Sequence, residues 1–372
     1  MTPLQFSPTL NRMIRQDEPT RLGDPTRPFL DVAVREGRAD DARQWLDYYL
    51  LEFKNIWFIF GVWDWYMVRY YLDRTGDDHW QYLLEQSIAP WIGTTAGLKG
   101  MPIARVEVEG HNARLSIPDY EWTFYLTEGD QRFDLTLNSP KEQQQRWSDW
   151  RATIERAIRA ADSGEFNRLL DAYVSEARLI HDILCDWAWA LLTFLARTWG
   201  ESVLDEVLRV TEAPWVTARY EKLRDMNLND SLQLTIEGMR GHFSGPNRAG
   251  TINVIEEADR YVLVFDACGT GGRMRRGDPL VGSGARTEPP YNFLMVQNAY
   301  DWTWQREGVC AYCAHCAVVN QILPIEGLGR PMRMTEYPAN ANDACRWIIY
   351  KDLKGFPADA YRAVGKEPPS HP

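Results

Sequence analysis

Two long apolar stretches, Ile56–Leu72 and Leu179–Phe194, set the predicted framework of the chain. Both contain charged residues: Asp64, Arg69, Asp182 and Asp186. Charged side chains are rare inside membrane spans, so we expect buried helices of a globular protein rather than transmembrane segments.

Each apolar stretch has a predicted end. Gly76 and Gly200 follow them, and glycine is the usual stop residue of a helix. A shorter helix is expected after each glycine, and it should end before Pro90 in the first case and before Pro214 in the second. Ser202 predicts a capping box at the start of the second short helix.

Strand signals come later in each half. Residues 104–117 ("ARVEVEGHNARLSI") and 121–137 ("EWTFYLTEGDQRFDLTL") alternate or are rich in β-formers, with turn residues between them. Residues 251–272 ("TINVIEEADRYVLVFDACGTGG") repeat this pattern. The order is helices followed by antiparallel strands, twice, which predicts an α+β fold.

The two halves also match residue by residue. "LDYYLLE" at 46–52 aligns with "LDAYVSE" at 170–176, and the offset of 124 then holds without a gap. The matching pairs are Glu52–Glu176, Ile56–Ile180, Trp63–Trp187, Trp65–Trp189, Gly76–Gly200 and Leu84–Leu208, with "APW" at 89–91 and 213–215. We therefore predict an internal duplication, a pseudo-dimer of a helix–helix–antiparallel-strand unit.

The predicted organisation has four parts. Residues 1–40 form a proline-broken arm laid over the surface, and residues 41–140 form a first, structural unit without cysteine. Residues 141–355 form the second unit, which carries a cysteine-rich site, and residues 356–372 form a C-terminal tail.

Composition and charge argue against some classes of partner and favour a small-molecule ligand. The 372 residues carry a net charge of −11, which argues against nucleic acid and anionic membrane surfaces as partners. The N-terminal stretch lacks the apolar region of a signal peptide, so a cytoplasmic protein with reduced thiols is expected. The 16 Trp, 17 Tyr and 13 Phe indicate a deep core or an apolar pocket for a small molecule.

Five of the six cysteines suggest a metal site. Cys310, Cys313 and Cys316 are spaced three apart, with Cys268 before them and Cys345 after them. Zinc is the preferred metal, with Cys268, Cys313, Cys316 and Cys345 as ligands and Cys310 in reserve. A [4Fe–4S] cluster is the alternative. The remaining alternative is that the thiols only fill a core.

A second cluster lies on the second apolar helix. His181, Asp182, Cys185 and Asp186 stand where the first half has Trp57, Phe58, Gly61 and Val62. Buried carboxyl and imidazole groups one helical turn apart suit proton transfer or support of a metal ligand. His181 and Asp182 are therefore candidate catalytic residues, and His242 on a glycine-rich loop is another. The alternatives are a core histidine, an Arg178–Asp182 ion pair and a solvated loop histidine.

The glycine-rich stretch 268–286 is a candidate anion site. Its glycines permit a nest of backbone N–H groups, and Arg273 is the candidate residue to hold a substrate carboxylate. Cys268 in this loop is an alternative nucleophile. A surface loop without function is the other interpretation. Trp187 is expected to help line the substrate pocket.

The end of the second half resembles two related families of small-molecule domains. The residues concerned are "VCAYCAHC" (309–316) and "GLGRPMRMTEYPANANDACRWIIYKD" (327–352). They are similar to the L-2-amino-thiazoline-4-carboxylate hydrolases and to the 4-vinyl-reductase domain, which combine an aromatic pocket, mid-domain cysteines and a late Cys-x-aromatic motif, here Cys345-Arg346-Trp347. The chain departs from the carboxylate–cysteine pattern of the second family, because Glu336 lies nine residues before Cys345. The resemblance implies a ligand-binding α+β domain with a thiolate site.

Together these features predict a metal-dependent enzyme, by default hydrolytic, that acts on a small aromatic or heterocyclic carboxylated compound. Two alternatives stay open: a small-molecule sensor with structural zinc, and an iron–sulfur redox protein. Association into a homo-oligomer also stays open.

Overall fold

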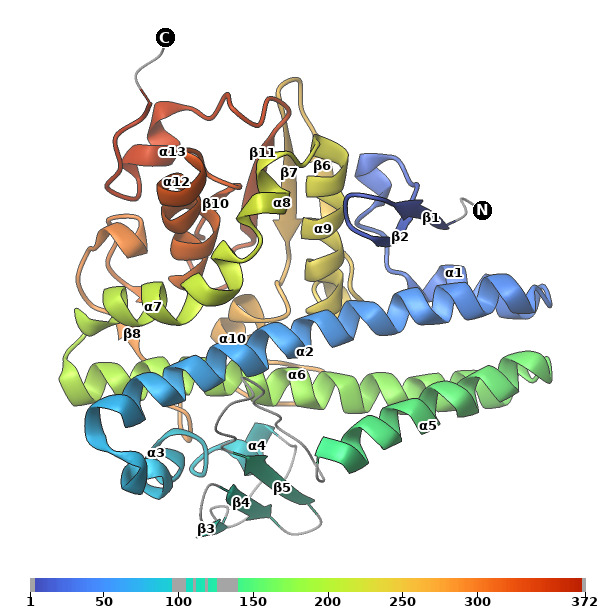
Figure 1. The fold of residues 1–372 in the computed structure, drawn as a ribbon, viewed down its shortest axis with the longest axis horizontal. Helices are drawn as coiled ribbons and strands as arrows, with labels where there is room; N and C mark the ends of the chain where they lie inside the picture. Colours follow the sequence, from blue (N-terminus) through green and yellow to red (C-terminus); the bar gives the residue numbers. More distant parts are fainter. Residues whose placement is uncertain (1–3, 96–104, 110–111, 118–119, 126–139, 370–372) are drawn as a thin grey trace.

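The fold is α+β and mostly helical, with small antiparallel sheets (Figure 1). The computed structural model describes residues 4–95, 105–109, 112–117, 120–125 and 140–369. Figure 1 shows two long helices crossing the molecule, with the C-terminal helices and the main sheet on one side of them and a smaller sheet on the other.

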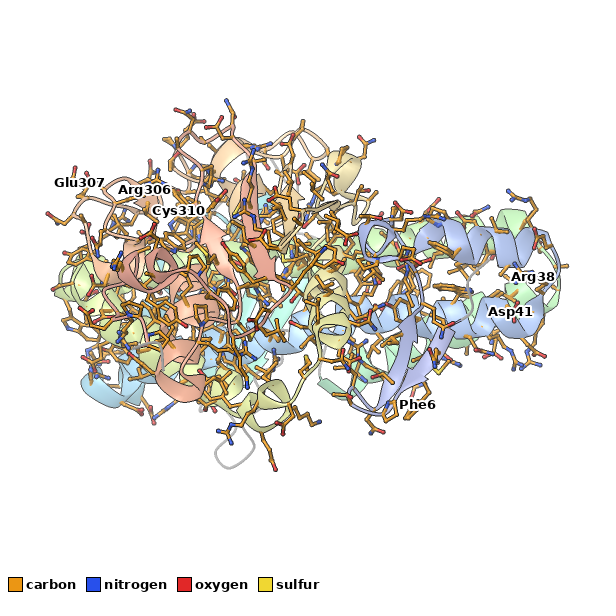
Figure 2. All side chains as sticks on the ribbon, turned by 90° about the horizontal axis from the view of Figure 1, so that it is seen from above. Phe6, Arg38, Asp41, Arg306, Glu307 and Cys310 are labelled. Carbon is orange, nitrogen blue, oxygen red and sulfur yellow. The ribbon has the colours of Figure 1, made fainter. Side chains whose placement is uncertain are left out.

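The two long helices are α2 (Ala39–Thr75) and α6 (Ser163–Trp199). They lie side by side and run in the same direction, since Phe53 neighbours Tyr173 and Tyr71 neighbours Phe194. Each is preceded by a helix that folds back along it, and these are α1 (Arg27–Arg35) and α5 (Pro140–Arg159). Figure 2 shows the start of α2, marked by Arg38 and Asp41, projecting away from the body that contains Cys310.

Both long helices have 37 residues and end where the sequence predicts. Gly76 and Gly200 follow them with φ of 103° and 93°, a region that favours glycine because it lacks a Cβ. Of the helices in the described ranges, α6 has the length and hydropathy to cross a membrane. However, 94% of its most apolar window is buried inside the molecule.

The short helices that follow differ from each other. Helix α3 (Trp80–Ser87) ends before Pro90 as predicted. Helix α7 (Val203–Thr217) runs through Pro214, so the predicted stop there is wrong. Pro214 is exposed, while Val207 and Val216 before and after it are buried on the inner face, and this packing outweighs the lost hydrogen bond. Ser202 makes no side-chain cap bond, so the predicted capping box is also wrong.

Four strands form the main sheet, in the order β10-β11-β7-β6 and all antiparallel. Their bounds are β6 (Asn253–Glu256), β7 (Arg260–Phe265), β10 (Met334–Glu336) and β11 (Cys345–Tyr350). Leu263 and Phe265 pack with α9 (Leu228–Gly241) on one face, and Val262 packs with α13 (Ala358–Arg362) on the other. The alternation of apolar side chains along β7 therefore builds two layers around the sheet.

The small sheet lies in the first half and has the order β3-β4-β5. Its strands are β3 (Arg105–Glu109), β4 (Asn112–Ile117) and β5 (Tyr120–Tyr125). The strand signals at 104–117 and 251–272 are thus confirmed, while most of the signal at 121–137 lies outside the described residues.

The N-terminal segment is more than a surface arm. It forms a hairpin and then α1, and Leu22 and Leu30 are fully buried. Apolar residues spaced along α1 face α2, so the segment joins the core.

The remaining short elements connect these layers. They are β1 (Leu4–Ser7), β2 (Arg12–Arg15), η1 (Pro19–Arg21), η2 (Asp77–His79), α4 (Ile92–Thr95), α8 (Tyr220–Arg224), η3 (Pro246–Arg248), α10 (Gly271–Arg276), β8 (Met295–Val296), η4 (Asp301–Thr303), β9 (Val309–Cys310), α11 (His315–Ala317), η5 (Val318–Ile322) and α12 (Leu323–Leu328).

Candidate functional site: a thiol-lined cavity beside an apolar cavity

Four cysteines line one internal cavity of about 50 Å³, hereafter the thiol cavity. They are the four that spacing selected: Cys268, Cys313, Cys316 and Cys345. The sheet brings them together, because β11 pairs with β7 so that Cys345 lies opposite Phe265, three residues before Cys268. Cys310 is fully buried and is not among the residues that line the cavity. All six cysteines of the chain are free thiols.

The glycine-rich loop is folded against the thiols. The backbone N–H of Gly272 donates to Cys268 Sγ at 2.9 Å, and the Thr270 hydroxyl lies 3.7 Å from the same sulfur. A Cβ added to Gly271 would lie 2.4 Å from Cys313 Sγ, so only glycine fits there without a shift. The glycines therefore allow the loop and the Cys-x-x-Cys turn to approach closely.

A buried arginine faces the thiols. Arg275 lines the cavity, and its Nε has no hydrogen-bond partner. Burial alone would lower the pKa of Arg275, but the nearby thiols, Cys313 foremost, outweigh it and raise the pKa. The pKa of Cys313 is lowered by its hydrogen bond with Cys310 and then by Arg275, whereas burial raises the pKa of Cys316 and Cys345. Arg275 thus places a positive charge opposite the thiols and favours the thiolate form of Cys313.

The thiols are not arranged as a single-ion site. Across the ranges that the structure describes, no group of three or more His, Cys, Asp or Glu side chains could hold one metal ion. In a tetrahedral zinc site the sulfurs, each ~2.3 Å from the metal, would lie roughly 3.8 Å apart. A zinc ion would therefore require the thiols to move from their described positions.

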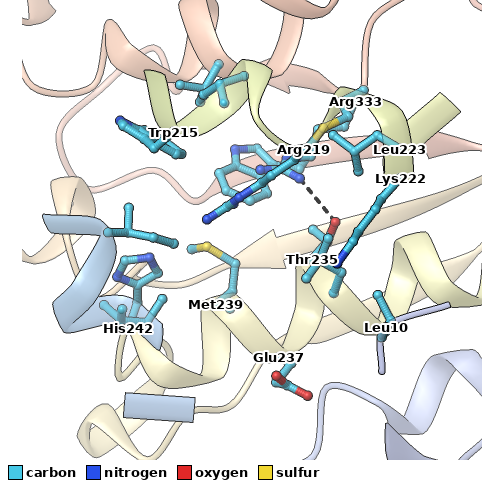
Figure 3. A pocket seen from close by; sticks show the side chains of 18 of the residues that line it. Leu10, Trp215, Arg219, Lys222, Leu223, Thr235, Glu237, Met239, His242 and Arg333 are labelled. Carbon is cyan, nitrogen blue, oxygen red and sulfur yellow. Dashed lines mark hydrogen bonds between the residues drawn. The ribbon is translucent and has the colours of Figure 1, made fainter. Parts of the chain in front are cut away.

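A second cavity of about 360 Å³, hereafter the apolar cavity, lies next to the first (Figure 3). One wall comes from α2 and includes Ile56, Phe60 and Trp63, so the first half of the chain contributes to the site. Other walls come from the segment around α8 and from α9. Four residues line both cavities: Met239, His242, His315 and Trp347.

Cations gather in the apolar cavity, and three of them are Arg219, Lys222 and Arg333. In Figure 3 the side chain of Arg219 extends in the direction of Met239, while Lys222 and Arg333 lie on the side of Thr235. Arg333 donates to the Thr235 hydroxyl at 3.1 Å and lies 4.2 Å from the centre of the Trp347 ring, but its buried Nε has no partner. Burial, with Arg219 nearby, lowers the pKa of Arg333 to about 10.

His242, at the border between the cavities, is the end of a hydrogen-bonded chain. Asp182 Oδ1 lies 2.9 Å from His181 Nδ1, and His181 Nε2 lies 3.2 Å from His242 Nδ1. Burial would raise the pKa of Asp182, but Arg273 and Arg248 outweigh it and hold the pKa well below its usual range. The ionised carboxylate can only accept, so His181 donates from Nδ1 and accepts at Nε2. His242 then donates from Nδ1, which leaves a lone pair on its Nε2.

His315 is the second histidine at the border. Its ring packs against Trp63 and Tyr312, with centroid distances of 5.1 and 5.0 Å. Its Nε2 is 3.3 Å from Cys316 Sγ, and its Nδ1 is 3.5 Å from the carboxyl of Glu212. Glu212 is fully buried and makes no hydrogen bond, and burial raises its pKa well above the ordinary value.

Arg273 and Trp187 lie elsewhere. Arg273 is buried and donates to Asp186 at 2.7 Å, and it also approaches Asp182 at 3.5 Å. The indole N–H of Trp187 donates to Ser87 at 3.0 Å within the core. Neither residue lines the thiol cavity or the apolar cavity. The local motif of glycines and arginines could not reveal that α6 supplies carboxylates to Arg273.

Sequence reasoning missed Arg219, Arg333, Glu212 and Trp63 as site residues. The repeat did point to Trp63 as the partner of Trp187, but it could not tell which of the two faces a cavity. Arg219 and Arg333 stand 114 positions apart with no shared motif, so no local signal links them.

Comparisons of the chain with protein-family models, with curated proteins and with solved structures found no match. The resemblance of residues 309–352 to small-molecule domains stays a prediction.

Proposed function

We propose that this protein is a metal-dependent enzyme. Its metal centre would be held by Cys268, Cys313, Cys316 and Cys345, and its substrate would be a small molecule in the apolar cavity. The observation that carries the proposal is the shared wall, because His242 and His315 border both cavities. A ligand in one cavity is thereby placed beside a group in the other.

The metal centre that suits this arrangement best is an iron–sulfur cluster. Four thiolates saturate zinc, and a closed zinc site has no open position to activate water, which weakens the hydrolytic expectation. Four cysteines are also the usual ligand set of a [4Fe–4S] cluster. The reaction class that follows is electron transfer between the centre and the bound molecule, with an external one-electron carrier protein returning the centre to its starting oxidation state.

His242 is the residue proposed to move a proton. Its Nε2 carries a lone pair because of the chain from Asp182 through His181. Burial lowers the pKa of His242 well below its ordinary value, so the ring is a neutral base at physiological pH. His181 and Asp182 act through it as positioning residues, since neither lines the thiol cavity or the apolar cavity.

The duplication is proposed as the origin of the site. Helices α2 and α6 are equal in length, start 124 positions apart and end at matching glycines. One copy then became the apolar wall of the cavity, and the other took on the polar network. This history explains why a single metal centre would serve two similar halves.

A second candidate function is a small-molecule binding or sensing protein with structural zinc. The four-thiolate set favours it, since such zinc sites are closed and hold a fold together. In that case the apolar cavity would bind its ligand without turnover.

The test is elemental analysis with a visible spectrum on anaerobically purified protein. We expect iron with sulfide and absorbance near ~400 nm, and loss of both in Cys345→Ser. Cys185→Ser is the matched control, because Cys185 is fully buried on α6 and lines neither cavity. One colourless zinc per chain would replace the first function with the second. Protein that binds no metal would overturn both.

A further inference from the structure

The apolar cavity has an unusual charge balance for its surroundings. The chain has a net charge of −11, and many of its arginines pair with carboxylates. Arg12, which also lines this cavity, pairs with Glu237. Among the residues that the structure describes, no Asp or Glu pairs with Arg219 or Arg333, which both line this cavity. The cavity therefore has cations whose charge no described side chain neutralises.

The burial of these two cations, which pair with no described carboxylate, points to an anionic ligand. Arg333 has a buried Nε with no hydrogen-bond partner, and burial lowers the pKa of both Arg219 and Arg333. A buried charge without a partner is costly, and such groups are normally satisfied by an opposite charge. A ligand anion at this end of the cavity would supply that charge and the missing acceptor. Arginine suits carboxylates because its planar fork can donate two parallel hydrogen bonds.

The shape and lining of the apolar cavity suit a flat apolar group. Trp63, Trp215 and Trp347 line it, together with aliphatic side chains of α2 and α9. Arg333 stacks on Trp347, and Arg219 lies 5.4 Å from the centre of the Trp215 ring. The guanidinium faces are thus covered by rings, which leaves their N–H edges to meet a ligand. A volume of about 360 Å³ lies within the range of small-molecule sites.

We propose that the apolar cavity binds a small aromatic carboxylic acid, with its carboxylate on Arg333 and Arg219 and its ring between Trp63, Trp215 and Trp347. The inference rests on the proposed function, since this acid would be the molecule placed beside the metal centre. It moves the anion site from Arg273, which is already paired with Asp186, to two arginines of the second cavity.

The experiment is calorimetric titration of the full-length protein with 2-naphthoate and with its neutral isostere, 2-naphthamide. We expect the acid to bind at least about tenfold more tightly than the amide, because an arginine–carboxylate bond is lost in the amide. Arg333→Met should remove this preference. Arg224→Met is the matched control, as Arg224 is an exposed residue of α8 that does not line the cavity, and it should leave the preference unchanged.

Equal affinity for acid and amide in the unaltered protein would overturn the inference, and so would a preference that survives in Arg333→Met. If Arg333→Met does not fold, Arg219→Met gives the same test. The titration is repeated on Cys345→Ser, which should lack metal. Naphthoate binding that persists there with its arginine dependence upholds this inference even if the native protein holds no metal. Metal without naphthoate binding upholds only the proposed function.

Discussion

The two long helices have the same length and the same kind of end, yet Asp64 on α2 and Asp186 on α6 are held in opposite ways. Asp64 on α2 is fully buried, and neither of its carboxyl oxygens has a hydrogen-bond partner. Asp186 on α6 is equally buried but accepts from Arg273, Arg286 and Thr95. The difference comes from segments that follow α6 in the chain, because they supply Arg273 and Arg286 to Asp186.

The carboxyl groups of Asp64 and Asp186 therefore differ in charge. Burial raises the pKa of Asp64 well above its ordinary value, so this carboxyl is neutral in the folded protein. Burial acts in the same direction on Asp186, but Arg273 and Arg286 outweigh it and lower the pKa. Asp64 therefore adds no charge to the wall that α2 contributes, while α6 carries the ionic framework that orients His181 and His242.

The largest effect is expected from removing the charge of Asp186. Asp186→Asn leaves Arg273 and Arg286 buried without their carboxylate, and we expect a loss of ~3–5 kcal/mol in the free energy of unfolding. The matched change Asp64→Asn replaces an already neutral group, so its effect should be within about 1 kcal/mol. Urea denaturation of both variants at neutral pH measures the difference. Equal losses in the two variants would contradict the assignment of charge to the two helices.

The next effect concerns pH. Burial lowers the pKa of His181 to about 4 in the folded protein, from an ordinary value of 6.5. The charged and titratable groups that face it are Asp182, Cys185, His242, Arg248 and Arg273. Between these two pH values an unfolded chain takes up a proton at His181 and the folded chain does not. The contribution of His181 to the free energy of unfolding is therefore fully present above pH 6.5. It is lost as the pH drops toward 4, by at most about 3 kcal/mol.

The pH effect is measured by urea denaturation at a series of pH values. His181→Asn removes the titrating ring, so its stability should fall less steeply over the same interval. His242 shares the direction of the shift, because burial lowers its pKa too, and part of the slope should remain in the variant. An unchanged slope would mean that His181 is not held neutral.

The sequence revealed local features of the fold well. The ends of α2 and α6 were predictable because an apolar run followed by glycine is a local signal. The course of α7 was not, because packing on both sides of Pro214 decides it. Strands β6 and β7 followed from alternation, while the short strands β8 and β9 carry too few residues for a pattern.

The candidate site also has parts that local sequence signals predicted and parts that they did not. Cysteine spacing selected four thiols that line one cavity, since Cys-x-x-Cys and a glycine loop are compact motifs. The anion-binding arginine was assigned to Arg273 because it stands in that loop, but its partner Asp186 lies 87 positions earlier. Arg333 and Arg219 become neighbours only through the tertiary fold, and no local motif marks either one.

Because the two cavities are adjacent, a ligand in the apolar cavity should be detectable from the metal centre. Visible and electron paramagnetic resonance spectra of the metal-loaded protein would be recorded with and without saturating 2-naphthoate. Because His242, His315 and Trp347 border both cavities, we expect the ligand to change the spectra of the metal centre. 2-Naphthoate that binds tightly to metal-loaded protein and leaves both spectra unchanged would contradict the account.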